Sequence, residues 1–155
     1  MLKFLGHAGF MYETDKQLLL MDPWMSKSGA FDSSWYQFPS NHEFGDEIRN
    51  IIEKSNKDIY IYISHEHKDH FDVPYLTTLE LEKINFITPK FRRDHVASVL
   101  NKLNPKSVMT PVDSELINID NLEIRLFLDD QEIVRDSALG LVDKDRDFTF
   151  LNLND

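Results

Sequence analysis

The chain has 155 residues, of which 41% are hydrophobic, and a net charge of −10. This length and composition predict one soluble globular domain over residues 1–155. The absence of cysteine excludes disulfides, thiolate zinc sites and cysteine-held iron–sulfur clusters within the chain. The acidic balance argues against nucleic acid and against an anionic membrane surface as partners, and with neither a signal peptide nor a long apolar run we expect a cytoplasmic protein.

The first third of the chain is predicted to be rich in strands. Apolar runs at residues 2–5, 10–14 and 17–21 predict three strands, the last two joined by a tight turn. Pro23 ends this pattern, because proline cannot continue a central strand ladder. Residues 25–43 are then predicted to form a loop, and a loop of that length is often a lid or a binding loop.

Helices and strands alternate in the middle of the chain, and the last third is predicted to be all β. Helices are expected over 47–54, from an N-cap at Asp72, and over 94–103, with strands at 59–64 and 85–88. Further strands are expected at 107–110, 116–119, 122–128, 137–142 and 148–153. This order predicts a layered α/β architecture. The charged run 143–147 is predicted to be a solvated turn.

Aromatic residues are concentrated in and beside the predicted long loop. They could line a substrate pocket, or they could form a small satellite core beneath the loop, and we favour the satellite core. The residues concerned are Trp24, Phe31, Trp35, Tyr36 and Phe38.

A cluster of potential metal ligands follows the predicted strand 59–64. The sequence Ser64-His65-Glu66-His67-Lys68-Asp69-His70 holds three of the six histidines of the chain. Imidazole nitrogen together with carboxylate oxygen suits zinc and its first-row neighbours. His65 and His67 would share one side of an extended segment, whereas Asp69 and His70 follow a turn and can approach from another direction. This density of ligands favours a metal site, with two ions a few ångströms apart, over a solvated polar loop.

The pattern His-x-His-x-Asp-His after a hydrophobic strand resembles the signature of the metallo-β-lactamase superfamily. The segments 6–10 and 22–24 are similar to the opening of the branch that contains L-ascorbate-6-phosphate lactonase and N-acyl-phosphatidylethanolamine-hydrolysing phospholipase D. A narrower resemblance, to the lactamase-fold portion of CMP-N-acetylneuraminate hydroxylase and its bacterial relatives, runs almost end to end. It rests on residues 22–24, 29–31, 35, 63–67, 89–91, 136–138 and 151–155.

The resemblance implies a four-layer αββα sandwich with two divalent metal ions, zinc first and manganese or iron as alternatives. His65 and His67 would bind metal one, Asp69 and His70 would bind metal two, and Asp155 would bridge them.

The resemblance also implies supporting and catalytic roles beside the ligands. Asp22 would lie beneath the site and orient the histidine loop. Asp69 could also orient the attacking water or accept its proton. For His7, the rim of the site and a purely structural hydrogen bond remain equal alternatives.

The chain departs from the family pattern in two ways. A third histidine for metal one is missing: the only histidine after His70 is His95, which we expect at the surface or in helix packing. Asp129, Asp130 and Asp136 are alternative oxygen donors. A late histidine for metal two is also missing. We therefore expect a C-terminally partial chain, a sandwich completed by a second chain or by a homo-oligomer, or a remnant with a weakened site.

Three functions follow from these observations. The first is a metal-dependent hydrolase that acts on a lactone, a phosphodiester or a related anionic small molecule. The second is the lactamase-fold component of an oxygenase-like system resembling sialic-acid hydroxylase, whose Rieske cluster would have to come from elsewhere. The third is a non-catalytic binding module that kept the fold.

Overall fold

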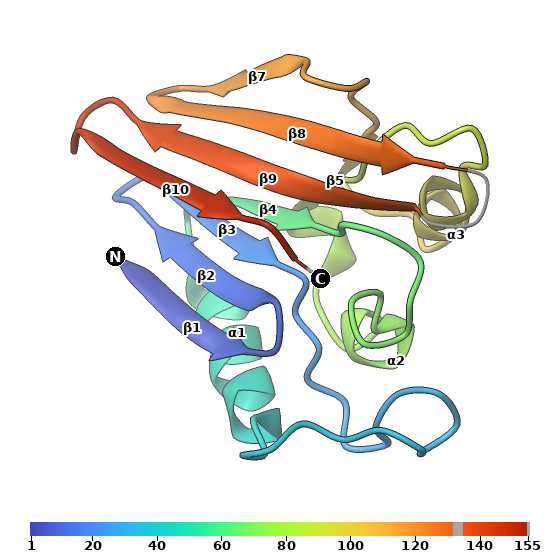
Figure 1. Cartoon of the computed structure of the whole chain (residues 1–155). Coiled ribbons are helices and arrows are strands. Elements are labelled where there is room, and N and C mark those ends of the chain that lie inside the picture. Colours follow the sequence, from blue (N-terminus) through green and yellow to red (C-terminus); the bar gives the residue numbers. More distant parts are fainter. Residues whose placement is uncertain (132–134, 155) are drawn as a thin grey trace.

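The computed structural model describes residues 1–131 and 135–154, which form two β-sheets and three α-helices. The first sheet has the order β1-β2-β3-β4-β5-β6, and the second has the order β10-β9-β8-β7 (Figure 1). The first sheet contains β1 (Leu2–Gly6), β2 (Gly9–Glu13), β3 (Gln17–Met21), β4 (Asp58–Tyr62), β5 (Ile84–Ile87) and β6 (Ser107–Met109). The second contains β7 (Leu116–Ile119), β8 (Leu122–Asp130), β9 (Arg135–Asp143) and β10 (Phe148–Asn152). The helices are α1 (His42–Lys54), α2 (Val73–Leu76) and α3 (His95–Lys102).

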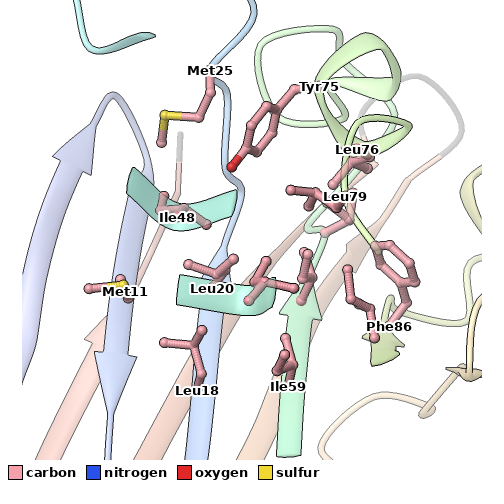
Figure 2. Packing of buried hydrophobic residues seen from close by; sticks show 14 of the residues in the cluster. Met11, Leu18, Leu20, Met25, Ile48, Ile59, Tyr75, Leu76, Leu79 and Phe86 are labelled. Atoms are coloured by element: carbon pink, nitrogen blue, oxygen red, sulfur yellow. The ribbon is translucent and has the colours of Figure 1, made fainter. Parts of the chain in front are cut away.

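The first sheet is buried on both faces, and its sequence shows why. In β3, Leu18 and Leu20 join the core beneath the helices, whereas Leu19 and Met21 join the core between the two sheets. Strand side chains alternate between faces, so a continuous apolar run is what a strand with two covered faces requires. Figure 2 shows the first of these cores, in which Ile48 of α1 packs over Leu18 and Leu20.

The described part of the chain forms three layers, namely helices, the first sheet and the second sheet. This mixed α/β arrangement agrees with the fold predicted from the sequence. The outer face of the second sheet carries Phe127 and Leu151, which are 45% and 53% exposed, and no helix in residues 1–131 or 135–154 covers it. None of the helices in these ranges is long and apolar enough to cross a membrane.

The predicted strands agree with the observed ones to within two residues at each end, but α1 begins earlier than expected. The sequence predicted a helix over 47–54, and the structure adds the turn that begins at His42. Gly45 lies in this added turn and weakens its helical signal. A Cβ at Gly45 would lie 3.2 Å from both Met25 and Tyr75, so glycine allows the helix to pack closely here.

Asp143 corrects the prediction that residues 143–147 form a solvated turn, because its side chain is fully buried. Its carboxylate accepts hydrogen bonds from Tyr12 Oη at 2.7 Å, Asn121 Nδ2 at 2.8 Å, and the backbone N–H groups of Asp145 and Arg146. Tyr12 belongs to the first sheet and Asp143 to the second. The carboxylate therefore ties the two sheets together.

We expect Asp143 to stabilise the fold in a pH-dependent way. Burial raises the pKa of its carboxyl, but the hydrogen bonds from Tyr12, Asn121 and the following backbone outweigh burial and lower that pKa below its usual value. A folded-state pKa below the unfolded one, which is about 3.9, gives stability that is present above about pH 4 and is lost as the pH falls further. Asp143→Asn should lower the free energy of unfolding at neutral pH by about 1–3 kcal/mol and flatten its decrease in acid.

Urea unfolding between neutral and acid pH measures this effect. Asp147→Asn is the matched control, because Asp147 lies in the same charged run and is exposed. Equal acid dependence in the Asp143→Asn variant and the original chain would contradict the assignment.

Candidate metal centre

The predicted ligands gather at one edge of the first sheet because several strands end there. β3 and β4 run parallel, so Asp22 and Ser64, which follow them, emerge at the same edge. β1 also ends there, and the turn after it carries His7. Gly9 closes this turn, because a Cβ at that position would lie only 2.9 Å from the carbonyl oxygen of Gly6. Residues 7, 22 and 64–70 thus lie together because the strands that precede them end at the same edge of the sheet.

Asp22 anchors the start of the histidine loop through one buried carboxylate. Its Oδ1 accepts the backbone N–H of Ser64 at 2.8 Å, and its Oδ2 accepts the Ser64 hydroxyl at 2.6 Å. The same Oδ2 lies 2.9 Å from His70 Nδ1. Asp22 and His70 are 1% and 0% exposed. A carboxylate partner on Nδ1 fixes the ring of His70, and its Nε2 then faces His7 Nε2, 3.2 Å away.

His7, Asp69 and His70 form the tightest group of donors at this edge. His7 Nε2 lies 3.0 Å from Asp69 Oδ2 and 3.2 Å from His70 Nε2. Within residues 1–131 and 135–154, these three side chains offer ligand atoms within 4.8 Å of one another. His7 and Asp22 both have positive φ angles, +52° and +39°. This region is uncommon outside glycine, but histidine and aspartate adopt it more readily than most residues, and eight other non-glycine residues of the described chain share it.

The chemistry of Asp69 fits a cation. Its Oδ1 is buried and has no hydrogen-bond partner among the residues that the structure describes, which is costly for a carboxylate oxygen. Burial raises the pKa of Asp69, but the contact with His7, the charge of His70 and a backbone hydrogen bond outweigh burial and lower it. The side chain is therefore an anion at neutral pH, and a divalent cation would satisfy Oδ1.

The donors expected for metal one are arranged less tightly. The rings of His65 and His67 lie 4.5 Å apart, and His67 is exposed, whereas His65 is 2% exposed. His65 Nδ1 lies 2.9 Å from Ser64 Oγ and 3.0 Å from Asp136 Oδ1. Burial raises the pKa of Asp136, and the contact with His65 together with the N–H of Ser137 lowers it further than burial raises it. Asp136 is thus an anion beside His65.

The other alternative donors lie away from the cluster. His95 is exposed on α3, as expected, and Asp130 is bound to Arg92, whose Nε lies 3.3 Å from Asp130 Oδ2. Asp129 is exposed and accepts a hydrogen bond from Gln131. Of the three aspartates that the sequence offered as oxygen donors, the structure brings Asp136 alone into contact with a candidate ligand, as far as the described residues show.

Asp155, the predicted bridging ligand, lies outside the described residues, whereas Asn154 lies within them. Asn154 Nδ2 donates to the carbonyl oxygen of Ser137 and to Tyr62 Oη. Ser137 Oγ in turn donates to the carbonyl oxygen of Ser64 at 3.0 Å. Burial raises the pKa of Tyr62 well above its usual value, so its hydroxyl stays protonated and donates to Ser137. Asn154, which follows β10, thus contacts Tyr62 of β4 and Ser137 of β9, and Ser137 in turn contacts the first residue of the histidine loop.

Asp72 holds the start of the long loop after β3 beside the centre through hydrogen bonds to its backbone. As predicted, Asp72 caps α2, accepting the Tyr75 N–H at 3.1 Å. Its second oxygen accepts the backbone N–H groups of Met25 and Ser26 at 2.9 and 2.7 Å. Figure 1 shows this loop extending beyond the sheets before it returns to α1.

The aromatic residues of this loop do not form the satellite core that we expected. Only Trp24, at 3% exposed, is buried among these five, whereas Phe31, Trp35, Tyr36 and Phe38 are 37%, 51%, 56% and 99% exposed. The described part of the chain places no second layer over them. Trp24, Trp35, Tyr36 and Phe38 line a cleft beside the centre instead, and the Phe31 ring stacks on that of Trp35 with centroids 5.8 Å apart.

Comparisons with known proteins agree with this arrangement. The family described as the β-lactamase superfamily domain matches residues 1–140. A Mycolicibacterium smegmatis protein, named provisionally as a Rieske 2Fe-2S iron–sulfur protein, is 30% identical over 97% of this chain. A Mycobacterium tuberculosis protein with the same provisional name is 31% identical over 97% of this chain. The chain spans 29% of the length of each of these relatives.

Solved structures show the same fold at low sequence identity. CmlA, a diiron β-hydroxylase from Streptomyces venezuelae, superposes with a TM-score of 0.67 at 16% identity, covering 99% of this chain and 29% of that one. A possible metal-dependent hydrolase from Veillonella parvula superposes with a TM-score of 0.69 at 11% identity, covering 99% of this chain and 62% of that one. The same fold therefore occurs in a protein described as a possible metal-dependent hydrolase and in one described as a diiron β-hydroxylase.

Proposed function

The chain belongs to the metallo-β-lactamase superfamily, and from this premise we propose that it is a metal-dependent hydrolase of a lactone, a phosphodiester or a related anionic small molecule. The observation that carries the proposal is the approach of His7 and His70 to Oδ2 of Asp69, whose other oxygen, Oδ1, is buried and has no partner in the described chain. Two divalent cations, zinc first and manganese or iron as alternatives, would polarise a carbonyl or phosphoryl oxygen and lower the pKa of water.

Metal two would be held from two sides. His70 would bind through Nε2, because its Nδ1 faces Asp22, and Asp69 would bind through its carboxylate. His7 Nε2, 3.2 Å from His70 Nε2, is placed to supply a third donor from the turn after β1. In this proposal His7 takes the position that the family fills with a late histidine.

Metal one would be held by His65 and His67 with help from Asp136. Asp136 would either bind the cation directly or orient the ring of His65. The distance of 3.0 Å between Asp136 Oδ1 and His65 Nδ1 supports both arrangements. Asp155 remains the proposed bridging carboxylate. The carboxylate of Asp69 would accept the proton of the attacking water or orient that water, and its lowered pKa keeps it in the required anionic form.

Hydrolysis assays on metal-depleted and reconstituted protein test this proposal. An ester, a lactone and a phosphodiester (p-nitrophenyl acetate, dihydrocoumarin and bis-p-nitrophenyl phosphate) cover the proposed classes of bond. We expect a chelator to abolish hydrolysis of at least one of them and added zinc, manganese or iron to restore it. A metal-loaded chain that hydrolyses none of the three would contradict a hydrolase of these classes.

A second candidate is the lactamase-fold component of an oxygenase-like system. Asp136 favours it, because two histidines with one carboxylate are a donor set typical of non-haem iron. The provisional Rieske name of the curated relatives also supports it. A Rieske cluster needs two cysteines, and this chain has none, so that cluster would lie outside these 155 residues. Retention of iron in preference to zinc by protein isolated with both metals available would favour this candidate.

A third candidate is a binding module without catalysis. Less than about one equivalent of tightly held transition metal per chain would favour it over both metal-dependent functions.

In each case the exposed outer face of β8 and β10 supports a second chain or a second copy as the layer that completes the sandwich. A strictly monomeric mass in solution would count against that partner.

A further inference from the structure

An aromatic cleft lies next to the candidate metal centre, on the side of β1. It has a volume of about 450 Å³ and opens between the end of β1 and the second half of the long loop. The walls include Phe4, His7, Trp24, Trp35, Phe38 and Phe44. Most of this surface is apolar, as is usual in sites that bind the flat apolar part of a small molecule.

The cleft carries no formal charge apart from any proton on His7. None of the described residues that line it is a lysine, arginine, aspartate or glutamate, although the whole chain has a net charge of −10. An anionic group placed here would find no cation among the lining side chains, and a cationic group would find no carboxylate among them. The ammonium of Lys3, which lies 4.3 Å from the centroid of the Phe44 ring, is paired with Glu47. An uncharged apolar group gives up no hydrogen bond or charge solvation on entering the cleft, and its transfer out of water is favourable in free energy.

His7 connects this cleft to the candidate metal centre. Its ring packs edge-on against Trp24, with centroids 5.6 Å apart, and lies 6.0 Å from the ring of Trp35. Its Nε2 lies 3.0 Å from Asp69 Oδ2 on the other side. If the reacting bond of a substrate lies at Asp69, the group attached to that bond can therefore lie in the neighbouring cleft.

Hydrogen bonds fix the floor of the cleft before any ligand binds, whereas the side chain of Phe38, at 99% exposed, is not held by packing. Asn41 Nδ2 donates to the carbonyl oxygens of Leu5 and Trp24 at 2.8 and 3.0 Å, and Gln37 Nε2 donates to that of Trp24 at 2.7 Å. Ala30 and Trp35 pair as an isolated antiparallel bridge. A preformed wall avoids the entropic cost of ordering a loop on binding.

We propose that this cleft binds an uncharged aromatic or flat cyclic group of the substrate, next to the bond that is cleaved. The inference rests on the proposed hydrolase function and names the part of the substrate that gives it specificity. The anionic part of the substrate then lies at the metal centre and its ring lies against Trp35 and Phe38. The exposure of these two side chains, 51% and 99%, is what a ligand would cover.

Titration with 2-phenylethanol tests the inference without requiring turnover. The readout is the pair of indole N–H signals of the two tryptophans in nuclear magnetic resonance spectra. We expect saturable shifts of the Trp24 and Trp35 signals. Phe38→Ala should raise the dissociation constant at least about tenfold, and so should Trp35→Ala, observed through Trp24. Phe127→Ala is the matched control, because Phe127 is equally an exposed aromatic residue but lies on the outer face of the second sheet. It should leave binding unchanged.

Three results would overturn the inference. One is no saturable shift up to the solubility limit. Another is equal or tighter binding of benzenesulfonate, which adds a fixed negative charge to the same ring. The third is a concentration-dependent dimer that Phe38→Ala abolishes, which would assign the aromatic surface to self-association. Failure of the titration in a chain that still hydrolyses esters would contradict the cleft alone. Saturable binding in a metal-loaded chain that hydrolyses nothing would contradict the hydrolase function alone.

Discussion

His70→Ala is expected to remove about one equivalent of bound divalent metal per chain, the cation proposed between Asp69 and His70. His70 is fully buried, its Nδ1 is fixed by Asp22, and its Nε2 lies 3.2 Å from His7 Nε2. Alanine deletes the donor at that position. Elemental analysis of protein isolated with zinc, manganese and iron available measures the loss.

His95→Ala provides the matched control for this measurement. His95 is a histidine at the start of α3 that is exposed and lies outside the candidate centre. We expect the same metal content in this variant as in the original chain. If His70→Ala retained the full metal content while remaining folded, metal two would have to be assigned to other residues.

Asp22→Ala is expected to lower the free energy of unfolding by about 3–5 kcal/mol, because it removes the acceptor of a buried network. The substitution leaves the Ser64 N–H, the Ser64 hydroxyl and His70 Nδ1 without the carboxylate that they now share. It also releases the ring of His70, so the metal affinity of the folded fraction should fall by about 10–100-fold. Urea unfolding and metal titration measure the two effects separately.

Asp32→Ala serves as the control for Asp22→Ala. The side chain of Asp32 is 92% exposed and pairs with Lys68 at the surface, an interaction that contributes little to stability. A small change in both variants would mean that the Asp22 network does not hold the histidine loop in place.

The strands could be predicted closely because their signal is local. The runs around Leu18–Met21 and Ile59–Tyr62 are continuously apolar, and only a strand covered on both faces accommodates them. For Asp22, only the resemblance to a family suggested a place beneath the histidine loop, because a lone aspartate before a proline carries no such signal. Its pairing with Ser64, 42 residues away, could not be predicted from the residues.

The remaining features depend on tertiary contacts that leave no local trace. The charge pattern of residues 143–147 gives no indication that Tyr12, 131 positions away, donates to Asp143. The position of His7 beside Asp69 requires the turn after β1 to fold back toward the histidine loop, which only the sheet order determines. The exposed aromatic residues were assigned to a core because apolar composition favours burial, yet the described chain has no layer above that loop.

The most direct test of a metal centre built from His7, Asp69 and His70 is anomalous diffraction from crystals supplied with zinc, manganese or iron, measured at the absorption edge of each metal. We predict a peak about 2.0–2.2 Å from His70 Nε2 and from a carboxylate oxygen of Asp69, with His7 Nε2 as a further donor. The absence of any peak at these atoms, in crystals that hold one of these metals in excess, would contradict the metal centre and the function proposed from it.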